Sequence, residues 1–256
     1  MINIDFYAYS NKLNTVHPLE KALFAIIAML ICLLSGSIVT PILILVLMTA
    51  AIVLMAGIPA RMYGKLLLLP LTFLLLSVLT IAFSAAASSA GFWISYPFGN
   101  LVVGMRFSDL IKAIHLFLRS LGGVSCLYFL ALTTPMTEVI ALLHKLKVPV
   151  LITELMILIY RFIFVFLESA ATIKRAQSSR LGYITLRSSF RSLSQLVAAL
   201  FGKVFIKSRE LFETMSARCY DGEINVLAKK HMVNYMNYVL IGAGTFLIIS
   251  LDIVWR

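Results

Sequence analysis

Charged side chains are scarce in this chain of 256 residues. Asp, Glu, Lys and Arg make up 13% of it, compared with about 25% in an ordinary soluble domain. Apolar residues account for 61%, and the mean hydropathy is +0.98. This composition excludes a disordered chain and a disulfide-stapled secreted domain, and it argues against a soluble enzyme. The sequence therefore predicts an all-α integral membrane protein.

Acidic residues are half as frequent as basic ones. The 11 Asp and Glu residues stand against 22 Lys and Arg residues, which leaves a net charge of +11. Nucleic-acid-binding domains share such an excess, but they are soluble. In a membrane protein it is better explained by the enrichment of Lys and Arg in cytoplasmic loops. We therefore predict the lipid bilayer, and no nucleic acid, as a partner.

Cysteines and ligand-binding motifs are few. Cys32, Cys126 and Cys219 are far apart and form no Cys-x-x-Cys pair, so we expect three small buried side chains. The chain has no phosphate-binding G-x-x-x-x-G-K-[ST] motif and no histidine spacing typical of a metal site. We predict no catalytic residue, no cofactor and no metal site. If ATP drives this protein, another subunit binds the ATP.

Long uncharged runs predict the membrane helices. No charged residue occurs between Ala22 and Ala60, a stretch about twice the roughly 20 residues that span a bilayer. The turn formers of 35–37 divide it into two helices. We place five crossings, with the C-terminus outside, at about 21–36, 40–58, 66–87, 109–133 and 232–254. Aromatic residues and turn formers predict an interfacial loop between Phe92 and Phe107.

Three basic side chains interrupt the fourth predicted crossing: Lys112, His115 and Arg119. Charges of this kind cost about 2.5–3.5 kcal/mol each at the centre of a bilayer. We expect them to face other protein or to lie near an interface. A substrate pathway is the alternative.

A basic region follows, and it decides the topology. Residues 174–230 contain half of the 22 Lys and Arg residues. A crossing at 150–167 would place this region outside, against the positive-inside rule. We therefore keep a long helix over 150–180 on the cytoplasmic side. Its charges at 154, 161, 168 and 175 recur every seven residues and form one polar stripe. A second amphipathic helix is predicted over 189–218.

These assignments give three parts. Residues 1–134 form the first four transmembrane helices, residues 135–231 form cytoplasmic coupling helices, and residues 232–256 form the last transmembrane helix. The N-terminus and the coupling helices are expected in the cytoplasm, and the chain in the plasma membrane as a multi-pass protein.

Each predicted cytoplasmic helix ends at an arginine. Arg180 follows Ser179, and Arg218 follows Ala217, with a glycine a few residues later in both cases. Arginine in the last turn stabilises a helix through its macrodipole. Small neighbours also leave each guanidinium free to offer its planar donors to an acidic groove on a partner.

The two arginines resemble signature motifs of the transmembrane T component of energy-coupling factor transporters, in its cobalt/nickel, CbiQ-like branch. That family carries two Ala-Arg-Gly motifs, matched here at 179–181 and 217–219. The first keeps only the arginine, and the second keeps Ala-Arg. Further matches follow the family's order along nearly the whole chain: Ile4-Asp5, Tyr7-Ala8-Tyr9, Pro18-Leu19-Glu20-Lys21, Thr134-Pro135, Val148-Pro149, Tyr160-Arg161, Phe190-Arg191 to Gly202, and Asp221-Gly222.

The resemblance implies a non-catalytic energy-coupling subunit. Two ABC-type ATPase subunits would each bind one arginine-tipped helix at Arg180 or Arg218, and their movement would reach a small substrate-binding S component. The cargo of that branch is Co²⁺ or Ni²⁺. A T component for biotin or for several vitamins is the alternative. A membrane enzyme using Lys112, His115, Arg119 and Glu154, and a secondary transporter or channel, are rivals of other classes.

Overall fold

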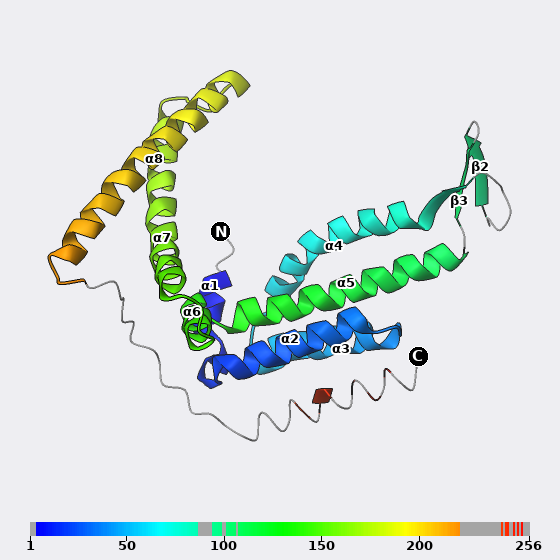
Figure 1. The fold of residues 1–256 in the computed structure, drawn as a ribbon. Coiled ribbons are helices and arrows are strands. Elements are labelled where there is room, and N and C mark those ends of the chain that lie inside the picture. Colours follow the sequence, from blue (N-terminus) through cyan, green and yellow to red (C-terminus); the bar gives the residue numbers. More distant parts are fainter. Residues whose placement is uncertain are drawn as a thin grey trace. The chain divides into compact units, whose positions relative to one another are not determined.

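The computed structural model describes residues 4–86, 94–98, 101–105 and 107–220, together with residues 242, 244, 245, 248, 250 and 252 (Figure 1). It divides into two compact units. The first consists of Met1–Pro135 and Lys230–Arg256, and the second of Met136–Lys229.

The first unit is a bundle of helices. It contains α1 (Ile4–Ser10), the short 3-10 helix η1 (Lys12–Thr15), α2 (Pro18–Leu34), α3 (Val39–Ala50) with the π-helical turn η2 (Ala51–Met55), α4 (Ala60–Ala82) and α5 (Phe107–Thr133). The prediction of a helical membrane protein is confirmed. Four described helices, two in each unit, are long and apolar enough to cross a bilayer, and the 17-residue α2 and Val39–Met55 are slightly shorter.

Both boundaries of the third predicted crossing, 66–87, differ in the structure, where the corresponding helix α4 ends at Ala82. The turn near 35–37 lies where expected, between α2 and α3. However, α4 begins at Ala60, six residues before the predicted run, so Arg61 and Lys65 lie within its first turns. The uncharged run marks only the embedded part of a helix, and basic side chains can extend from its end toward water.

The interfacial loop predicted between Phe92 and Phe107 is partly a sheet. Strands β1 (Phe83–Ala86), β2 (Ile94–Phe98) and β3 (Leu101–Met105) form an antiparallel sheet in the order β1-β3-β2. Phe98 pairs with Leu101, with only Gly99-Asn100 between them. A glycine-containing dipeptide between two apolar runs is a hairpin signal, and at this position it is a better guide to the structure than the aromatic content. Pro97 fits because β2 is an edge strand.

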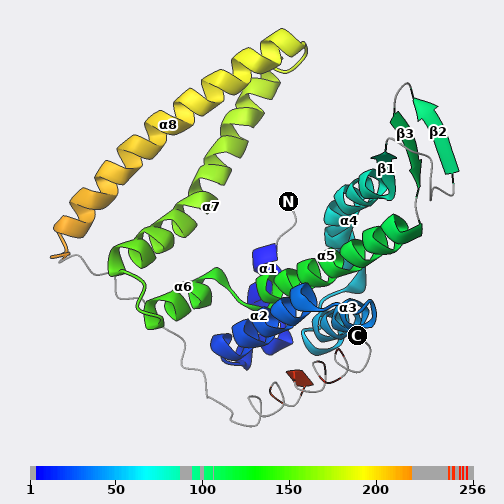
Figure 2. The same cartoon turned by 45° about the vertical axis from the view of Figure 1, so that its right-hand side comes forward.

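Helix α5 packs against α2, α3 and α4, as Figure 2 shows. The fully buried side chains between them include Ile44, Met48 and Leu132. Gly122 permits the closest approach, because a Cβ built there would lie 2.7 Å from Cys32 Sγ and 3.3 Å from the carbonyl oxygen of Pro41. Among the cysteines, Cys32 and Cys126 are buried, as expected, whereas Cys219 is exposed.

Two of the three basic side chains that interrupt α5, those of Arg119 and Lys112, have polar contacts within the chain, whereas the buried Nε2 of His115 has no hydrogen-bond partner among the described residues. Arg119 Nε donates to the carbonyl oxygen of Cys32 at 3.2 Å. Lys112 Nζ lies 3.8 Å from Asp109 Oδ1, near the start of the helix. These contacts agree with the expectation that the charges face other protein or lie near an end of the helix.

Contacts within the bundle show which residues lie at each of its two ends. At one end, the N–H of Lys12 donates to the carbonyl oxygen of Ala56 at 3.1 Å, and Lys21 Nζ donates to that of Thr133 at 2.9 Å. At the other end, the Asp252 carboxylate accepts hydrogen bonds from the Ser35 hydroxyl and, at 2.7 Å, from the Thr40 hydroxyl. Asp252 therefore lies at the α2–α3 turn, at the opposite end of α2 from Lys21.

The second unit contains α6 (Met136–Lys145), α7 (Val150–Ser179) and α8 (Leu186–Ser216). The two long helices correspond to the predicted amphipathic helices at 150–180 and 189–218. Thr185 caps α8 in a capping box with Ser188, which explains why α8 begins three residues before the predicted boundary. Of the predicted polar stripe on α7, only Glu154 is buried.

Candidate coupling site

Both predicted arginines lie at helix ends that have the same backbone hydrogen bonds. At the end of α7, the N–H of Gly182 donates to the carbonyl oxygen of Gln177 at 2.9 Å. At the end of α8, the N–H of Tyr220 donates to that of Met215 at 3.1 Å. This six-residue closure is the Schellman motif. We name the two ends the Arg180 cap (residues 177–182) and the Arg218 cap (residues 215–220).

The residue after each arginine has a left-handed backbone. Leu181 has φ = 60° and Cys219 has φ = 58°. Glycine adopts this conformation without steric cost, whereas residues that carry a Cβ do so rarely. The resembled Ala-Arg-Gly motif has its glycine at this position. Leu181 and Cys219 therefore adopt, with larger side chains, a backbone conformation that favours glycine.

The cap geometry alone does not distinguish the arginines. The end of α6 closes in the same way, with a hydrogen bond of 3.2 Å from the N–H of Val148 to the carbonyl oxygen of Leu143 and φ = 62° at Lys147. There, Leu146 occupies the position that arginine occupies in the other two caps. What sets the Arg180 and Arg218 caps apart is the guanidinium group.

Both guanidinium groups are available to a partner. Arg180 and Arg218 are exposed, and so are their predicted neighbours Ser179 and Ala217. Across the residues that the structure describes, neither arginine side chain forms a hydrogen bond or an ion pair with this chain. Ser179 instead donates to the carbonyl oxygen of Arg175 at 3.1 Å.

The structure places the two arginines at opposite ends of an antiparallel helix pair (Figure 2). Gln177 Nε2, near the end of α7, donates to the carbonyl oxygen of Ser192 near the start of α8 at 2.9 Å. Tyr220, just after α8, is hydrogen-bonded to Glu154 near the start of α7. The 31 residues of α8 span about 46 Å. The two predicted sites are therefore separate contact points rather than one cluster.

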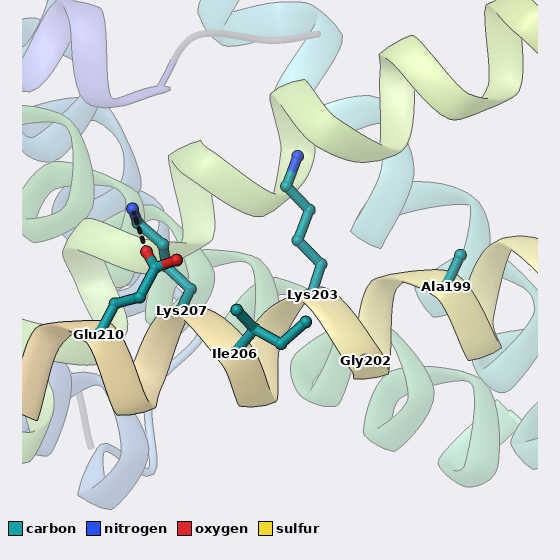
Figure 3. Close-up of a pocket in the computed structure, with 6 residues that line it drawn as sticks. All are labelled: Ala199, Gly202, Lys203, Ile206, Lys207 and Glu210. Carbon is teal, nitrogen blue, oxygen red and sulfur yellow. Dashed lines mark hydrogen bonds and ion pairs between the residues drawn. The ribbon is translucent and has the colours of Figure 1, made fainter.

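The hollows on the described surface are shallow. The one in Figure 3 is lined by six residues of α8 alone, among them Lys207 and Glu210, whose Nζ and Oε2 atoms lie 3.0 Å apart. A second hollow, between Phe190 and Phe201, also belongs to α8 alone. Among the described residues, no three His, Cys, Asp or Glu side chains are grouped to hold a metal ion.

Comparison with known proteins identifies the family. The profile of the cobalt transport protein family CbiQ matches residues 9–228. The chain belongs to this family. It is 36% identical over 224 residues to an uncharacterized protein of Methanocaldococcus jannaschii, covering 88% of this chain and 82% of that protein.

Two relatives have names that describe them as cobalt transport proteins. The cobalt transport protein CbiQ of Salmonella typhimurium is 32% identical over 158 residues, which is 62% of this chain and 70% of that protein. A protein of Methanocorpusculum labreanum that is named as a fused cobalt transport protein, CbiMQ, is 33% identical over 221 residues. This match covers 86% of the present chain and 36% of the fused protein. The chain is thus a membrane protein of a cobalt transport family.

Proposed function

We propose that this chain is the energy-coupling membrane subunit of an ATP-driven importer of cobalt or nickel ions. Two separate ATPase subunits bind the Arg180 and Arg218 caps, and their movement passes through α7 and α8 to a separate substrate-binding membrane subunit. The observation that supports this proposal best is the repetition of one cap, with an exposed arginine that forms no bond within the described chain, at both ends of the helix pair.

The separation of the caps suits two binding partners. A helix of 31 residues is about 46 Å long, so a single shallow groove on one partner does not reach both arginines. Each guanidinium offers a planar fork of donors that matches a carboxylate in two parallel hydrogen bonds. Two copies of one ATPase, each with an acidic groove, would therefore occupy the two caps.

The contacts of the bundle support a cytoplasmic position for the coupling helices. The bundle end that contains Lys21 and Thr133 also carries Lys12, Arg61 and Lys65, and the chain leaves it directly for α6. The positive-inside rule assigns this end to the cytoplasm. Helix α5 ends at this end of the bundle, and Asp252 lies at the opposite end. The chain therefore crosses the membrane an odd number of times between Thr133 and Asp252. This parity agrees with five crossings and an outer C-terminus.

The family supports the proposed cargo. The matching profile and the named relatives are those of cobalt transport proteins. The fused relative carries additional cobalt transport sequence in the same polypeptide, which supports the idea that the present chain works beside a second membrane subunit.

The test is to replace each arginine by alanine. Loss of one partner of a buried charged contact costs about 2–5 kcal/mol, so Arg180→Ala or Arg218→Ala should lower ATPase binding at least about tenfold. The readouts are co-purification of the ATPases and uptake of radioactive cobalt. Arg187→Ala, which removes another exposed arginine of the same unit, is the matched control. Full uptake by the Arg180→Ala/Arg218→Ala double variant would overturn the proposal.

A further inference from the structure

The Arg218 cap is tied to the far end of the other long helix. The hydroxyl of Tyr220 donates to Oε2 of Glu154 at 2.9 Å, across 66 residues of sequence. Glu154 lies in the second turn of α7 and is only 6% exposed, although it is an acidic residue. A buried carboxylate of this kind requires hydrogen-bond partners, and a hydrogen bond that a carboxylate accepts is stronger than one between two neutral groups.

The Arg180 cap is held differently. There the chain itself joins α7 to α8, and three side-chain hydrogen bonds reinforce the connection. The Gln177 amide donates to the carbonyl oxygen of Ser192 at 2.9 Å, and the Ser192 hydroxyl donates to the carbonyl oxygen of Gly182 at 2.8 Å. The Tyr183 hydroxyl donates to the side-chain oxygen of Gln177 at 2.7 Å. At the Arg218 cap, no direct connection of the chain joins the end of α8 to the start of α7. The two helices need side-chain contacts to stay together at that end.

The backbone at Cys219 makes the tyrosine contact possible. Its left-handed φ of 58° turns the chain back after Arg218, and the N–H of Tyr220 closes the cap on Met215. The exposed Arg218 therefore lies in the same short turn that carries Tyr220. A movement imposed on Arg218 reaches Tyr220 through two peptide units.

We propose that Glu154 and Tyr220 are positioning residues that hold the Arg218 cap to the start of α7. This inference rests on the proposed function, because it supposes that a partner moves the cap at Arg218. The hydrogen bond transmits that movement directly to the first turns of α7. Without the bond, the last turn of α8 moves independently, and part of the movement is lost before it reaches α7.

The exposed thiol of Cys219 provides a direct measurement. It lies between Arg218 and Tyr220, whereas Cys32 and Cys126 are buried. A nitroxide spin label attached to Cys219 in the detergent-purified full chain reports the mobility of the cap, with Cys219→Ser as the unlabelled control. We expect Tyr220→Phe and Glu154→Leu to increase the mobility. Arg218→Ala should leave it unchanged, and so should Tyr183→Phe at the other cap.

Uptake gives the second measurement, in the assembled complex without the label. Tyr220→Phe should reduce cobalt uptake by about tenfold or more, since the net contribution of a hydrogen bond to a charged group is lost. Binding of the ATPases should be retained. Glu154→Gln keeps a side-chain oxygen that can accept the hydrogen bond from Tyr220. This variant should therefore retain most of the uptake, and the spin label at Cys219 should stay as immobile as in the unchanged protein. The double variant Tyr220→Phe/Glu154→Leu should be no worse than the poorer single variant.

The outcomes separate this inference from the proposed function. Unchanged label mobility in Tyr220→Phe, or additive losses in the double variant, would overturn the positioning role even if the arginine variants fail to take up cobalt. Full uptake in the arginine variants would overturn the proposed function. The label would still report whether Tyr220 and Glu154 hold the cap.

Discussion

Leu181 and Cys219 have nearly the same left-handed backbone angle, φ of 60° and 58°, each directly after an arginine that ends a long helix. The two caps are 38 residues apart in sequence, yet their closing hydrogen bonds agree residue for residue. Left-handed geometry costs about 1–2 kcal/mol at a residue with a Cβ. The second unit holds this conformation without glycine after both arginines, as it does at Lys147 after α6, so contacts and hydrogen bonds in each cap must offset the cost.

Glycine at either position should stabilise the helix pair. Leu181→Gly or Cys219→Gly removes the left-handed cost, and the greater freedom of glycine in the unfolded chain offsets part of the gain, so each should add about 0.5–1 kcal/mol. Ala199→Gly, at an exposed position inside α8, should instead destabilise by about 1 kcal/mol. Thermal unfolding of the purified variants measures both effects. A lower unfolding temperature for both cap variants would contradict the assigned geometry.

Cys219 also provides a test of membrane sidedness. Its exposed thiol belongs to the Arg218 cap, and the other two thiols are buried. If this cap faces the cytoplasm, a membrane-impermeant maleimide should label the chain in inside-out vesicles and not in intact cells. Labelling of Cys32 and Cys126 should require denaturation. Labelling of Cys219 in intact cells would reverse the proposed orientation.

Lys21 stabilises the end of α5. The residue is 3% exposed, and its ammonium group donates to the carbonyl oxygen of Thr133, one of the last carbonyls of that helix. A positive charge at the C-terminal end of a helix also interacts favourably with the helix dipole. Lys21→Met should therefore destabilise the protein by about 1.5–3 kcal/mol, the range for hydrogen bonds to charged groups. Lys65→Met removes an exposed lysine of α4 and should change stability by less than about 0.5 kcal/mol. Equal unfolding temperatures for the two variants would rule out this role for Lys21.

Within the residues that the structure describes, the sequence predicted most helices well because their signals are local, and the predicted crossing at 232–254 lies almost wholly outside those residues. Uncharged runs, the turn at 35–37 and the amphipathic period of 150–180 each act over neighbouring residues. The sequence also indicated the arginines, since a helix end with small residues and glycine is visible in the chain. It did not indicate the antiparallel arrangement that separates Arg180 from Arg218, nor the bond between Glu154 and Tyr220. Both depend on contacts between distant residues, whereas the seven-residue spacing predicts only that Glu154 belongs to a polar stripe of its own helix.

The close approach of α5 to α2 at Gly122 gives a last prediction with an internal control. Gly122→Ala introduces a Cβ 2.7 Å from Cys32 Sγ, and the structure must shift to accept it, so the variant should lose about 1–3 kcal/mol of stability. Gly123 is the neighbouring residue on the same helix, and a Cβ built there meets nothing within 4 Å. Gly123→Ala should therefore stabilise the protein by about 0.5–1 kcal/mol through helix propensity.

A second substitution identifies the clash. Cys32→Ala removes the sulfur atom that the new Cβ meets, so the Gly122→Ala/Cys32→Ala double variant should recover part of the lost stability. Recovery should be incomplete, because the carbonyl oxygen of Pro41 remains 3.3 Å from the same Cβ position. Thermal unfolding of the four variants in one detergent checks the prediction. Strictly additive losses in the double variant would show that Gly122 and Cys32 do not meet, because only residues in contact deviate from additivity.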